Sequence, residues 1–385
     1  MYLGSLTFLG WLLLAGSAVG CCYLLYAGLA TRGFAGRVPA RPGRSPPASL
    51  LKPLCGEDPD LYANLVSFCR QDYPSWQIVF GVQDPADPAI AVVRRLIAEF
   101  PDADLKLVVE GGRAGDNLKV ANLQNMLPAA RHDLIVIADS DIRVSPDYLA
   151  AVTAPLLDPA TGLVTCLYRG VPAAGIWSRL AALHVNHGFL PQVLVAERLG
   201  ASGGCFGATI ALGRDTLAAI GGFAAVADTL ADDHALGAAV RRLGRKVVLS
   251  PYIVDDIIVE PGLDTLFRHE LRWARTIRAI APAGFLGSVV TQPMVLALAA
   301  VALGGQPVAA PVMLLAALAC RGVMARMVDR ALKLPPTPLW LLPGRDLLSF
   351  AVFVASFFTR KVAWRDRTFR VGRNGRLILD GDKPA

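Results

Sequence analysis

Two long stretches without a charged residue limit what this chain can fold into. No Asp, Glu, Lys or Arg occurs from Met1 to Thr31, and none occurs from Ala279 to Cys320. A helix needs about 20 apolar residues to cross the core of a bilayer. The first stretch therefore predicts one membrane span. The second is long enough for two spans joined at a turn near Gly304 and Pro307.

A third apolar stretch, residues 347–358, is short for a crossing. Several prolines precede it, and Arg345 and Asp346 would have to enter the membrane to lengthen it. A tilted span, a re-entrant segment and an interfacial helix are all compatible with this pattern.

The basic residues predict an orientation. No basic residue precedes Arg32, so a cleaved signal peptide with a positive start is not indicated. Arg37, Arg41 and Arg44 follow the first span closely, and the positive-inside rule then places the N-terminus outside and the following domain in the cytoplasm. Two later crossings would return the chain to the cytoplasm near Arg321. A full third crossing would put the basic tail outside, which favours the re-entrant or interfacial alternative.

The composition agrees with a soluble domain joined to membrane segments. Of the 385 residues 54% are hydrophobic, and the formal charge is +7. This composition is too apolar for an ordinary soluble enzyme and too charged for a pure membrane bundle. The basic surplus favours anionic lipid over nucleic acid as a partner. Seven cysteines without C-x-x-C spacing indicate neither a disulfide framework nor a zinc site.

Strand-like and helix-like segments alternate after a proline-rich linker. Strands are expected at residues 76–82, 105–110 and 134–139, with helices at 89–100 and 118–127 between them. This alternation predicts an α/β fold with a mainly parallel, doubly wound sheet, whose ligands bind beyond the carboxyl ends of the strands. The expected divisions are an anchor at 1–31, the linker at 32–48, the α/β domain at 49–267, an interfacial helix at 268–280, a membrane region at 281–360 and a basic cytoplasmic tail at 361–385.

In the sequence DLIVIADSDIRV, residues 133–144, Asp139 and Asp141 come at the end of a predicted strand. Residues i and i+2 of an extended chain project to the same face, so both carboxylates can reach one site. Close like charges raise each other's pKa, and a divalent cation such as Mg²⁺ or Mn²⁺ removes that penalty. A turn that caps the next element is the alternative, and the strand-end position leaves the two open.

Other polar residues follow strands in the same way. Asp84 ends the strand at 76–82, where it is either a turn residue or an acceptor for a base or ribose. Lys119 and Asn122 follow a glycine-rich loop and could face a diphosphate, although a single helical lysine is more often solvated. No G-x-G-x-x-G follows the first strand and no P-loop motif occurs, so dinucleotide and P-loop sites are weakly indicated.

Two further segments carry candidate chemistry. Asp232 and Asp233 begin a helical run, where they either complement the helix dipole or supply a general base. In RHELRWARTIR, His269, Arg272 and Trp273 lie on one helical face. That segment is typical of a membrane-interface helix, and its guanidinium groups also match phosphate oxygens.

Together the motifs VQDPADPAI, NLKVANL, IADSDIRVSPD, ADDHALG and HELRW resemble, in this order, the family-2-like inverting glycosyltransferases of the GT-A fold. The chain is most similar to the ceramide glucosyltransferase group of family 21, which includes bacterial hopanoid-pathway relatives. The resemblance covers about residues 49–280 and includes the N-terminal anchor and the C-terminal membrane region.

The resemblance implies roles for the matching residues. Asp84 would contact the uridine of a UDP-sugar, and Asp139 and Asp141 would bind the metal and the diphosphate. Asp233 would be the general base, with Asp232 beside it. Arg272 and Trp273 fall on the R-W of the Q/R-x-x-R-W motif, near the leaving diphosphate and the acceptor, and His269 stands where Gln or Arg is usual.

The implied reaction is a single displacement that moves glucose or an N-acetylglucosamine-type sugar from UDP to the hydroxyl of ceramide or a hopanoid. A polyprenyl phosphate or diacylglycerol acceptor is the alternative. A D-x-D phosphatase and a non-catalytic nucleotide-sugar-binding membrane protein are less favoured. The expected enzyme is a multi-pass inner-membrane protein, and its sequence predicts no nucleic-acid partner and no particular oligomeric state.

Overall fold

The computed structural model describes residues 2–39, 43–56, 59–112, 115–201, 203–358, 361–364, 367–371 and 377–379. The chain forms two compact units, each assembled from separate segments. We call them the sheet unit and the helical unit. The sheet unit is Arg37–Ala173 with Gly203–Val259, and the helical unit is Met1–Gly36 with Ala174–Ser202 and Glu260–Ala385.

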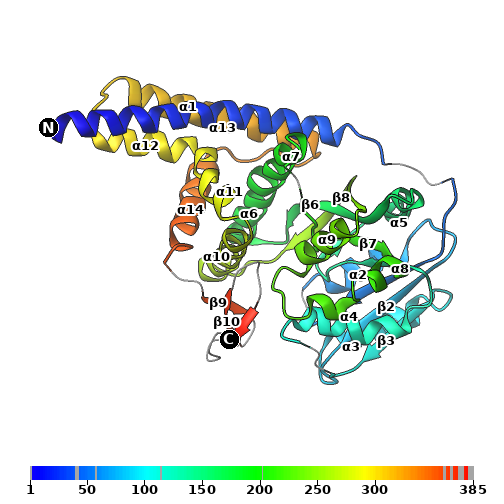
Figure 1. Cartoon of the computed structure of the whole chain (residues 1–385). Helices are drawn as coiled ribbons and strands as arrows, with labels where there is room; N and C mark the ends of the chain where they lie inside the picture. Colours follow the sequence, from blue (N-terminus) through cyan, green and yellow to red (C-terminus); the bar gives the residue numbers. More distant parts are fainter. Residues whose placement is uncertain are drawn as a thin grey trace. The chain divides into compact units, whose positions relative to one another are not determined.

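The sheet unit is built on a mixed eight-stranded sheet in the order β3-β2-β1-β4-β7-β6-β8-β5 (Figure 1). The first half is parallel, as the alternating pattern predicts, because β1 pairs in parallel with both β2 and β4, and β2 pairs so with β3. The second half is mixed: β6 pairs in parallel with β8, whereas β7 runs antiparallel to β4 and β6, and β5 runs antiparallel to β8. The strands are β1 (Ala48–Pro53), β2 (Trp76–Val82), β3 (Leu105–Val109), β4 (Leu134–Ile137), β5 (Ile142–Arg143), β6 (Thr161–Pro172), β7 (Ile210–Gly213) and β8 (Lys246–Ile258).

Helices cover both faces of this sheet, so its central strands are buried on both sides. In β1, Leu50 pairs in register with Ile78 and Val136 and faces one core cluster, whereas Leu51 faces the other. The first cluster is covered by α2 (Leu61–Cys69), α3 (Ala89–Glu99) and α5 (Tyr148–Thr153), and the second by α4 (Leu118–Met126), α8 (Arg214–Ala219) and α9 (Asp232–Arg242).

The helical unit contains the two apolar stretches. Its elements are α1 (Tyr2–Ala35), α6 (Gly175–His184), a π-helical turn (Val185–Phe189), α7 (Leu190–Arg198), α10 (Leu263–Ile280), α11 (Pro282–Gly287), the short helix η5 (Ser288–Thr291), α12 (Pro293–Leu303), α13 (Ala309–Ala331), α14 (Leu341–Ala355) and a small antiparallel sheet of β9 (Lys361–Trp364), β10 (Arg367–Val371) and β11 (Leu377–Leu379). The helix α10 carries the HELRW motif and begins five residues before the range expected from the sequence, at Leu263 rather than 268.

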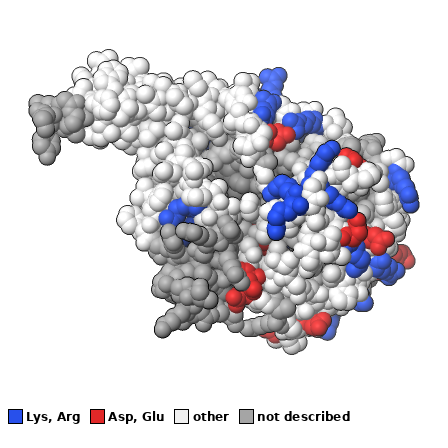
Figure 2. All heavy atoms as spheres, viewed as in Figure 1, with Lys and Arg blue, Asp and Glu red and all other residues white. Residues whose placement is uncertain are grey.

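Two described helices are long and apolar enough to cross a membrane, Thr7–Ala35 and Ala309–Ala331. A third span is possible if Pro282–Thr291 and Pro293–Leu303, which meet at a bend of 68°, count as one. The turn predicted near Gly304 is present between α12 and α13. Gly304 ends α12 with a φ of 70°, a conformation that glycine adopts freely. On the face shown in Figure 2, the described surface of these helices is uncharged over most of their length, and charged atoms lie toward the right-hand end. The helix α14, which holds the third apolar stretch, is not among the candidate spans of the described chain.

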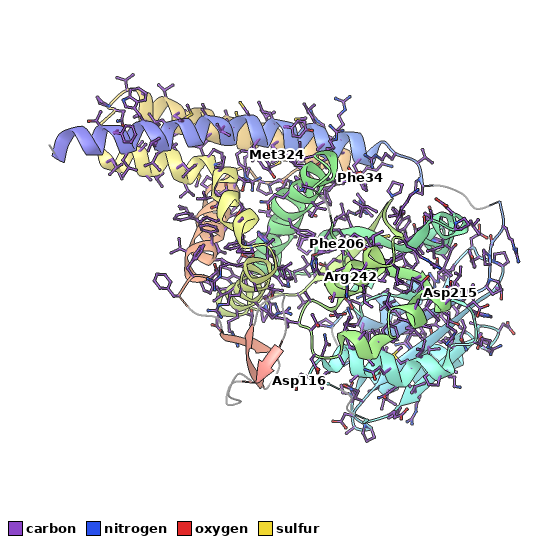
Figure 3. The ribbon with its side chains drawn as sticks, viewed as in Figure 1. Phe34, Asp116, Phe206, Asp215, Arg242 and Met324 are labelled. Carbon is purple, nitrogen blue, oxygen red and sulfur yellow. The ribbon has the colours of Figure 1, made fainter. Side chains whose placement is uncertain are left out.

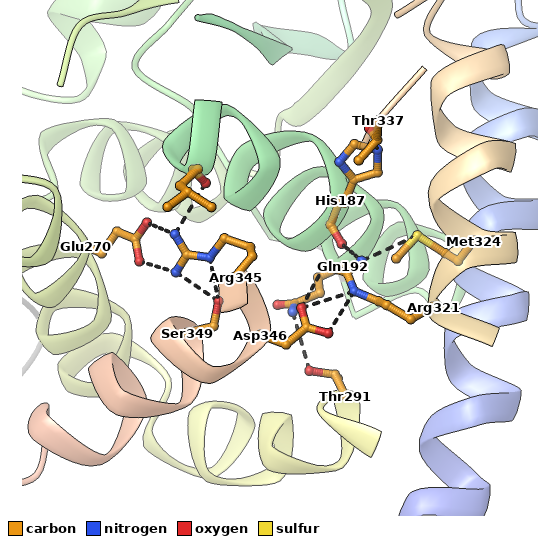
Figure 4. Close-up of polar contacts among 11 residues, drawn as sticks. His187, Gln192, Glu270, Thr291, Arg321, Met324, Thr337, Arg345, Asp346 and Ser349 are labelled. Atoms are coloured by element: carbon orange, nitrogen blue, oxygen red, sulfur yellow. Dashed lines mark hydrogen bonds and ion pairs between the residues drawn. The ribbon is translucent and has the colours of Figure 1, made fainter. Parts of the chain in front are cut away.

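Buried ion pairs join α14 to its neighbours within the helical unit (Figure 4). The Arg345 guanidinium donates to both carboxylate oxygens of Glu270 in α10, at 2.7 and 2.6 Å, and both side chains are at most 2% exposed. The next residue, Asp346, accepts from Arg321 in α13 at 2.9 and 3.1 Å. The two charges that the sequence places awkwardly beside an apolar stretch are thus neutralised inside the bundle, and they link α14 to α10 and α13.

Replacing Arg345 by Met should leave the Glu270 carboxylate buried without a partner. Breaking a buried pair in this way costs about 3–5 kcal/mol of unfolding free energy. We expect Arg345→Met to lower the unfolding temperature of the full chain in detergent markedly, and the double variant Arg345→Met/Glu270→Met to recover much of the loss. The exposed Arg330 in α13 gives the control Arg330→Met, which should unfold like the parent. An Arg345→Met variant as stable as this control would contradict the account.

Candidate active site

The N-terminus of α4 is tied to the loop before α9 by one asparagine. The Asn117 side-chain oxygen accepts from the Val120 N–H at 3.1 Å and so caps α4. Its amide donates to the Thr229 carbonyl at 2.8 Å and to Asp232 Oδ1 at 3.3 Å. Two segments that are far apart in the sequence therefore meet at the same edge of the sheet.

Lys119, in the first turn of α4, meets the carboxylates at this edge. Its Nζ lies 2.5 Å from Asp139 Oδ1 and 4.0 Å from Asp232 Oδ2. Burial alone would lower the pKa of Lys119, but Asp139, Asp232 and Asp233 outweigh it and raise that pKa above its usual value. The lysine is therefore a permanent positive charge beside Asp139, and it is not the solvated helical lysine that was the alternative.

A second lysine, which the sequence reading overlooked, lies beneath the same carboxylates. Lys52 of β1 is fully buried, donates to the main-chain oxygen of Asp139 at 2.5 Å, and lies 3.8 Å from the centre of the Phe68 ring. Burial lowers the pKa of Lys52 to about 7, although Asp141 and Asp139 oppose that shift. The signal that was available is a lysine inside the otherwise apolar strand SLLKP.

The pKa of Asp141 shows that the carboxylates here lack a compensating positive charge. Burial and the neighbouring Asp139 raise its pKa to about 7. Asp256 of β8, also overlooked in the sequence, has its pKa raised by burial and then by Asp141 and Asp139. A bound divalent cation would relieve this repulsion, and carboxylate oxygens suit Mg²⁺ or Mn²⁺.

The residues that could hold a cation at this site are few. Within the described part of the chain no three His, Cys, Asp or Glu side chains form a group that could hold a metal ion. Asp139 and Asp141 could supply two carboxylate ligands to a cation such as Mg²⁺, which usually completes its coordination shell with water and phosphate oxygens.

Asp233 is held in place by backbone donors at the start of α9. Its Oδ2 accepts from the Gly207 N–H at 2.9 Å and its Oδ1 from the His234 N–H at 2.7 Å. Burial, and then the adjacent Asp232, raise the pKa of Asp233 to about 6. A carboxylate with such a pKa is ionised near neutral pH and can still accept a proton.

Gly207 marks the point where these charged groups converge. A side-chain carbon added there would lie 3.2 Å from Lys119 Nζ, 3.4 Å from Asp139 Oδ2 and 3.5 Å from Asp233 Oδ2. Figure 3 labels its neighbour Phe206, whose N–H donates to Thr165 Oγ1 at 2.8 Å and fixes this segment before β7. The structure therefore brings Lys119, Asp139 and Asp233 together around Gly207.

Asp84 and Asn122 lie in different settings. Asp84 is exposed, and its Oδ1 accepts from the Ala86 N–H at 2.8 Å, which is the geometry of a turn. Asn122 is 4% exposed and donates to the Gly81 carbonyl at 2.8 Å and to the Leu54 carbonyl at 3.5 Å. Asn122 thus connects the ends of β1 and β2, and contact of either residue with a donor stays a prediction.

Arg143, which follows the aspartate pair, is engaged by α2. Its Nη2 donates to Asn64 Oδ1 at 3.0 Å and lies 3.3 Å from Asp60 Oδ1. This arginine holds the segment after the pair in place.

The predicted residues of α10 belong to the helical unit. His269 Nδ1 lies 2.7 Å from Glu260 Oε1, and the Trp273 ring stacks on His184 at 6.5 Å between centroids. Burial lowers the pKa of Arg272, and no hydrogen bond or ion pair engages its guanidinium among the described residues. A half-buried cation of this kind is suited to an anionic ligand.

The mixed sheet with its acidic edge is the architecture of a GT-A glycosyltransferase. It is similar to the solved structure of the mannosyltransferase PcManGT from Pyrobaculum calidifontis in complex with GDP-Man and Mn²⁺, with a TM-score of 0.55 and 20% identity over 91% of this chain and 99% of that one. Residues 12–377 match the sequence profile of Glycosyl transferase family 21. The chain belongs to this family, which confirms the resemblance drawn from its motifs.

Curated relatives agree with the assignment. Ceramide glucosyltransferase 1 of Caenorhabditis elegans is 26% identical over 343 residues, which cover 86% of this chain and 73% of the relative. The ceramide glucosyltransferase of Candida albicans is 32% identical over a shorter segment of 113 residues, covering 26% of this chain and 21% of that protein. The phosphatase alternative finds no support in either the fold or the family.

Metal affinity should depend on pH because a cation competes with the proton on Asp141. The carboxylate is mostly protonated below its pKa of about 7 and ionised above it. Each pH unit below 7 should therefore weaken Mn²⁺ binding about tenfold, and affinity should level off above pH 8. The free Mn²⁺ signal in electron paramagnetic resonance measures this directly.

The exposed Asp102 supplies a matched control for that titration. Asp102→Asn should keep both the affinity and its pH dependence, whereas Asp141→Asn should bind Mn²⁺ weakly at every pH. Equal Mn²⁺ affinity of the parent protein at pH 6 and pH 8 would contradict the electrostatic account of the site.

Proposed function

We propose that this protein is a membrane-bound inverting glycosyltransferase that transfers a hexose from a UDP-sugar to the hydroxyl of a lipid, ceramide or a hopanoid. The convergence of Lys119, Asp139 and Asp233 around Gly207 is the observation that carries the proposal. A cation site, a fixed positive charge and a base are the parts that transfer from a sugar diphosphate requires. The relatives' names, ceramide glucosyltransferase, support the lipid acceptor.

In this proposal the sheet unit binds the donor. Asp84 accepts hydrogen bonds from the uridine, and Lys119 faces the diphosphate with Asn122 behind it. Mg²⁺ or Mn²⁺ held by Asp139 and Asp141 would supply positive charge against the departing diphosphate. Lys52 donates to the main-chain oxygen of Asp139 and so holds the segment that carries Asp139 and Asp141 in place.

The transfer itself is a single displacement. Asp233 takes the proton of the acceptor hydroxyl while the oxygen forms its bond to the anomeric carbon, and the bond from that carbon to the diphosphate breaks with its electrons leaving on UDP. Arg272, a cation without a carboxylate partner among the described residues, stabilises the charge that develops on the leaving group. Trp273 lies beside it, and His269 holds the start of the motif through Glu260. Inversion at the anomeric carbon follows.

The candidate spans give this chemistry its location. Thr7–Ala35 and Ala309–Ala331 would anchor the protein in a membrane, with the catalytic residues on the cytoplasmic side that the arginines after the first span favour. An amphipathic acceptor then presents its hydroxyl at the surface from which the donor arrives.

The proposal is tested by transfer. The purified full chain, incubated with Mn²⁺, UDP-glucose or UDP-N-acetylglucosamine, and ceramide or a hopanoid polyol, should form a glycolipid that mass spectrometry detects. Polyprenyl phosphate and diacylglycerol serve as the alternative acceptors. Release of phosphate or UDP without transfer of sugar to any of these lipids would overturn the proposal.

The role of Asp233 separates it from the donor-binding carboxylates. Asp233→Asn removes the base but keeps the shape of the side chain, so transfer should fall about 10²- to 10⁴-fold while UDP still binds in the presence of Mn²⁺. Asp139→Asn, at the metal pair, should lose both transfer and Mn²⁺-dependent UDP binding. Calorimetry for UDP and the glycolipid assay for transfer measure the two effects. Normal turnover by Asp233→Asn would exclude it as the base.

A further inference from the structure

A pocket of about 270 Å³ lies within the helical unit. Its walls come from α1, the π-helical turn, α10, α11, α13 and α14. Much of the lining is aromatic or aliphatic, including Phe285, Phe353 and Val352. Mainly apolar pockets with a few placed polar groups are typical of small-molecule sites.

Several uncharged polar groups of the pocket lie where the apolar helices bend. Gln292 connects η5 to α12 at this bend, and its buried Oε1 has no hydrogen-bond partner among the residues that the structure describes. Close by, Gln192 Nε2 reaches toward Thr291 Oγ1 at 3.5 Å (Figure 4). A buried carbonyl oxygen without a donor is costly, so a ligand that carries a hydroxyl or amide N–H would fit here.

The charges of the lining cancel one another. Glu270, Arg321 and Asp346 line the pocket, yet Arg321 is bound by Asp346, and Glu270 is bound by Arg345. A phosphate group needs a cation that is not already neutralised. The described lining offers no such cation, so the pocket suits an uncharged ligand.

The pocket also reaches the family motif. Trp273 of the R-W pair lines it, and the ring of His184, another lining residue, stacks on this tryptophan. The helix α1, a candidate span, contributes Tyr23 and Leu24 to the same lining. The pocket therefore extends from a membrane helix to the residue adjacent to Arg272.

We propose that this pocket binds an uncharged lipid that carries a hydroxyl or an amide N–H, with its polar part at Gln292 and its hydrocarbon against the aromatic lining. Only the identification of this lipid as the acceptor rests on the proposed function. The pairs Arg345–Glu270 and Arg321–Asp346 act here as positioning residues that keep the pocket electrically neutral. Polyprenyl phosphate is thereby disfavoured as the acceptor.

Two glycines of α11 provide a matched test. Gly284 lines the pocket, and a side-chain carbon added there would have its nearest neighbour, the Ala281 Cβ, at 4.0 Å, so a leucine fits at this wall without a clash. Gly287, on the same helix, is equally exposed, has nothing within 4 Å of such a carbon and is not part of the lining. Binding of a fluorescent short-chain ceramide to the full chain in detergent, without donor or metal, is measured by polarisation.

We expect Gly284→Leu to weaken ceramide binding at least about tenfold, which corresponds to about 1.4 kcal/mol, and Gly287→Leu to leave it unchanged. Gln292→Leu removes the unpartnered oxygen and should weaken binding about three- to tenfold. Farnesyl phosphate should compete poorly. Unchanged binding in both Gly284→Leu and Gln292→Leu would overturn the site, and equal competition by farnesyl phosphate would overturn its preference for uncharged lipid.

The experiment separates this inference from the proposed function. Sugar transfer to ceramide together with normal ceramide binding by Gly284→Leu and Gln292→Leu would remove the pocket assignment and leave the transferase intact. Ceramide binding that Gly284→Leu abolishes, with no sugar transfer by the parent protein, would keep the pocket and remove the function.

Discussion

The repulsion among carboxylates at one edge of the sheet is the constraint on which the rest of the site depends. Asp139, Asp141, Asp232 and Asp233 converge there, and the buried lysines neutralise only part of their charge. The raised pKa values of Asp141 and Asp233 show that the negative charge at this edge is not fully neutralised. These groups stay together despite their repulsion because Asn117 caps α4, backbone N–H groups donate to Asp233, and Gly207 approaches closely. A cation and a sugar diphosphate, bound together, would relieve the strain that the protein maintains.

In the helical unit the constraint is different, because single charged side chains lie inside an apolar bundle. Charged side chains in an apolar bundle are tolerated there because each finds a partner, as Arg345 finds Glu270 and Arg321 finds Asp346. Such pairs add little net stability compared with apolar packing, because desolvation offsets the attraction. Their contribution here is to place α10, with its R-W motif, against α14, and to leave the neighbouring pocket without net charge.

The sequence predicted the elements whose signal is local. The parallel half of the sheet follows from alternating apolar segments, and the aspartate pair follows from a strand end. The antiparallel pairings were not predicted because the strands that make them are short: β5 has two residues and β7 has four. Lys52 and Asp256 were missed because a single polar residue in a strand does not reveal which strands will be its neighbours. The roles of all the predicted site residues, among them Asp84, Asp233 and Arg272, remain predictions.

The coupling between cation and nucleotide tests the central claim most directly. If Asp139 and Asp141 share a cation with the donor diphosphate, Mn²⁺ and UDP must strengthen each other's binding by the same factor. Calorimetric titration of the full chain with UDP should show an affinity about tenfold to a hundredfold higher with Mn²⁺ than without it, and Asp141→Asn should remove this enhancement. An affinity for UDP that is the same with and without Mn²⁺ would contradict the account.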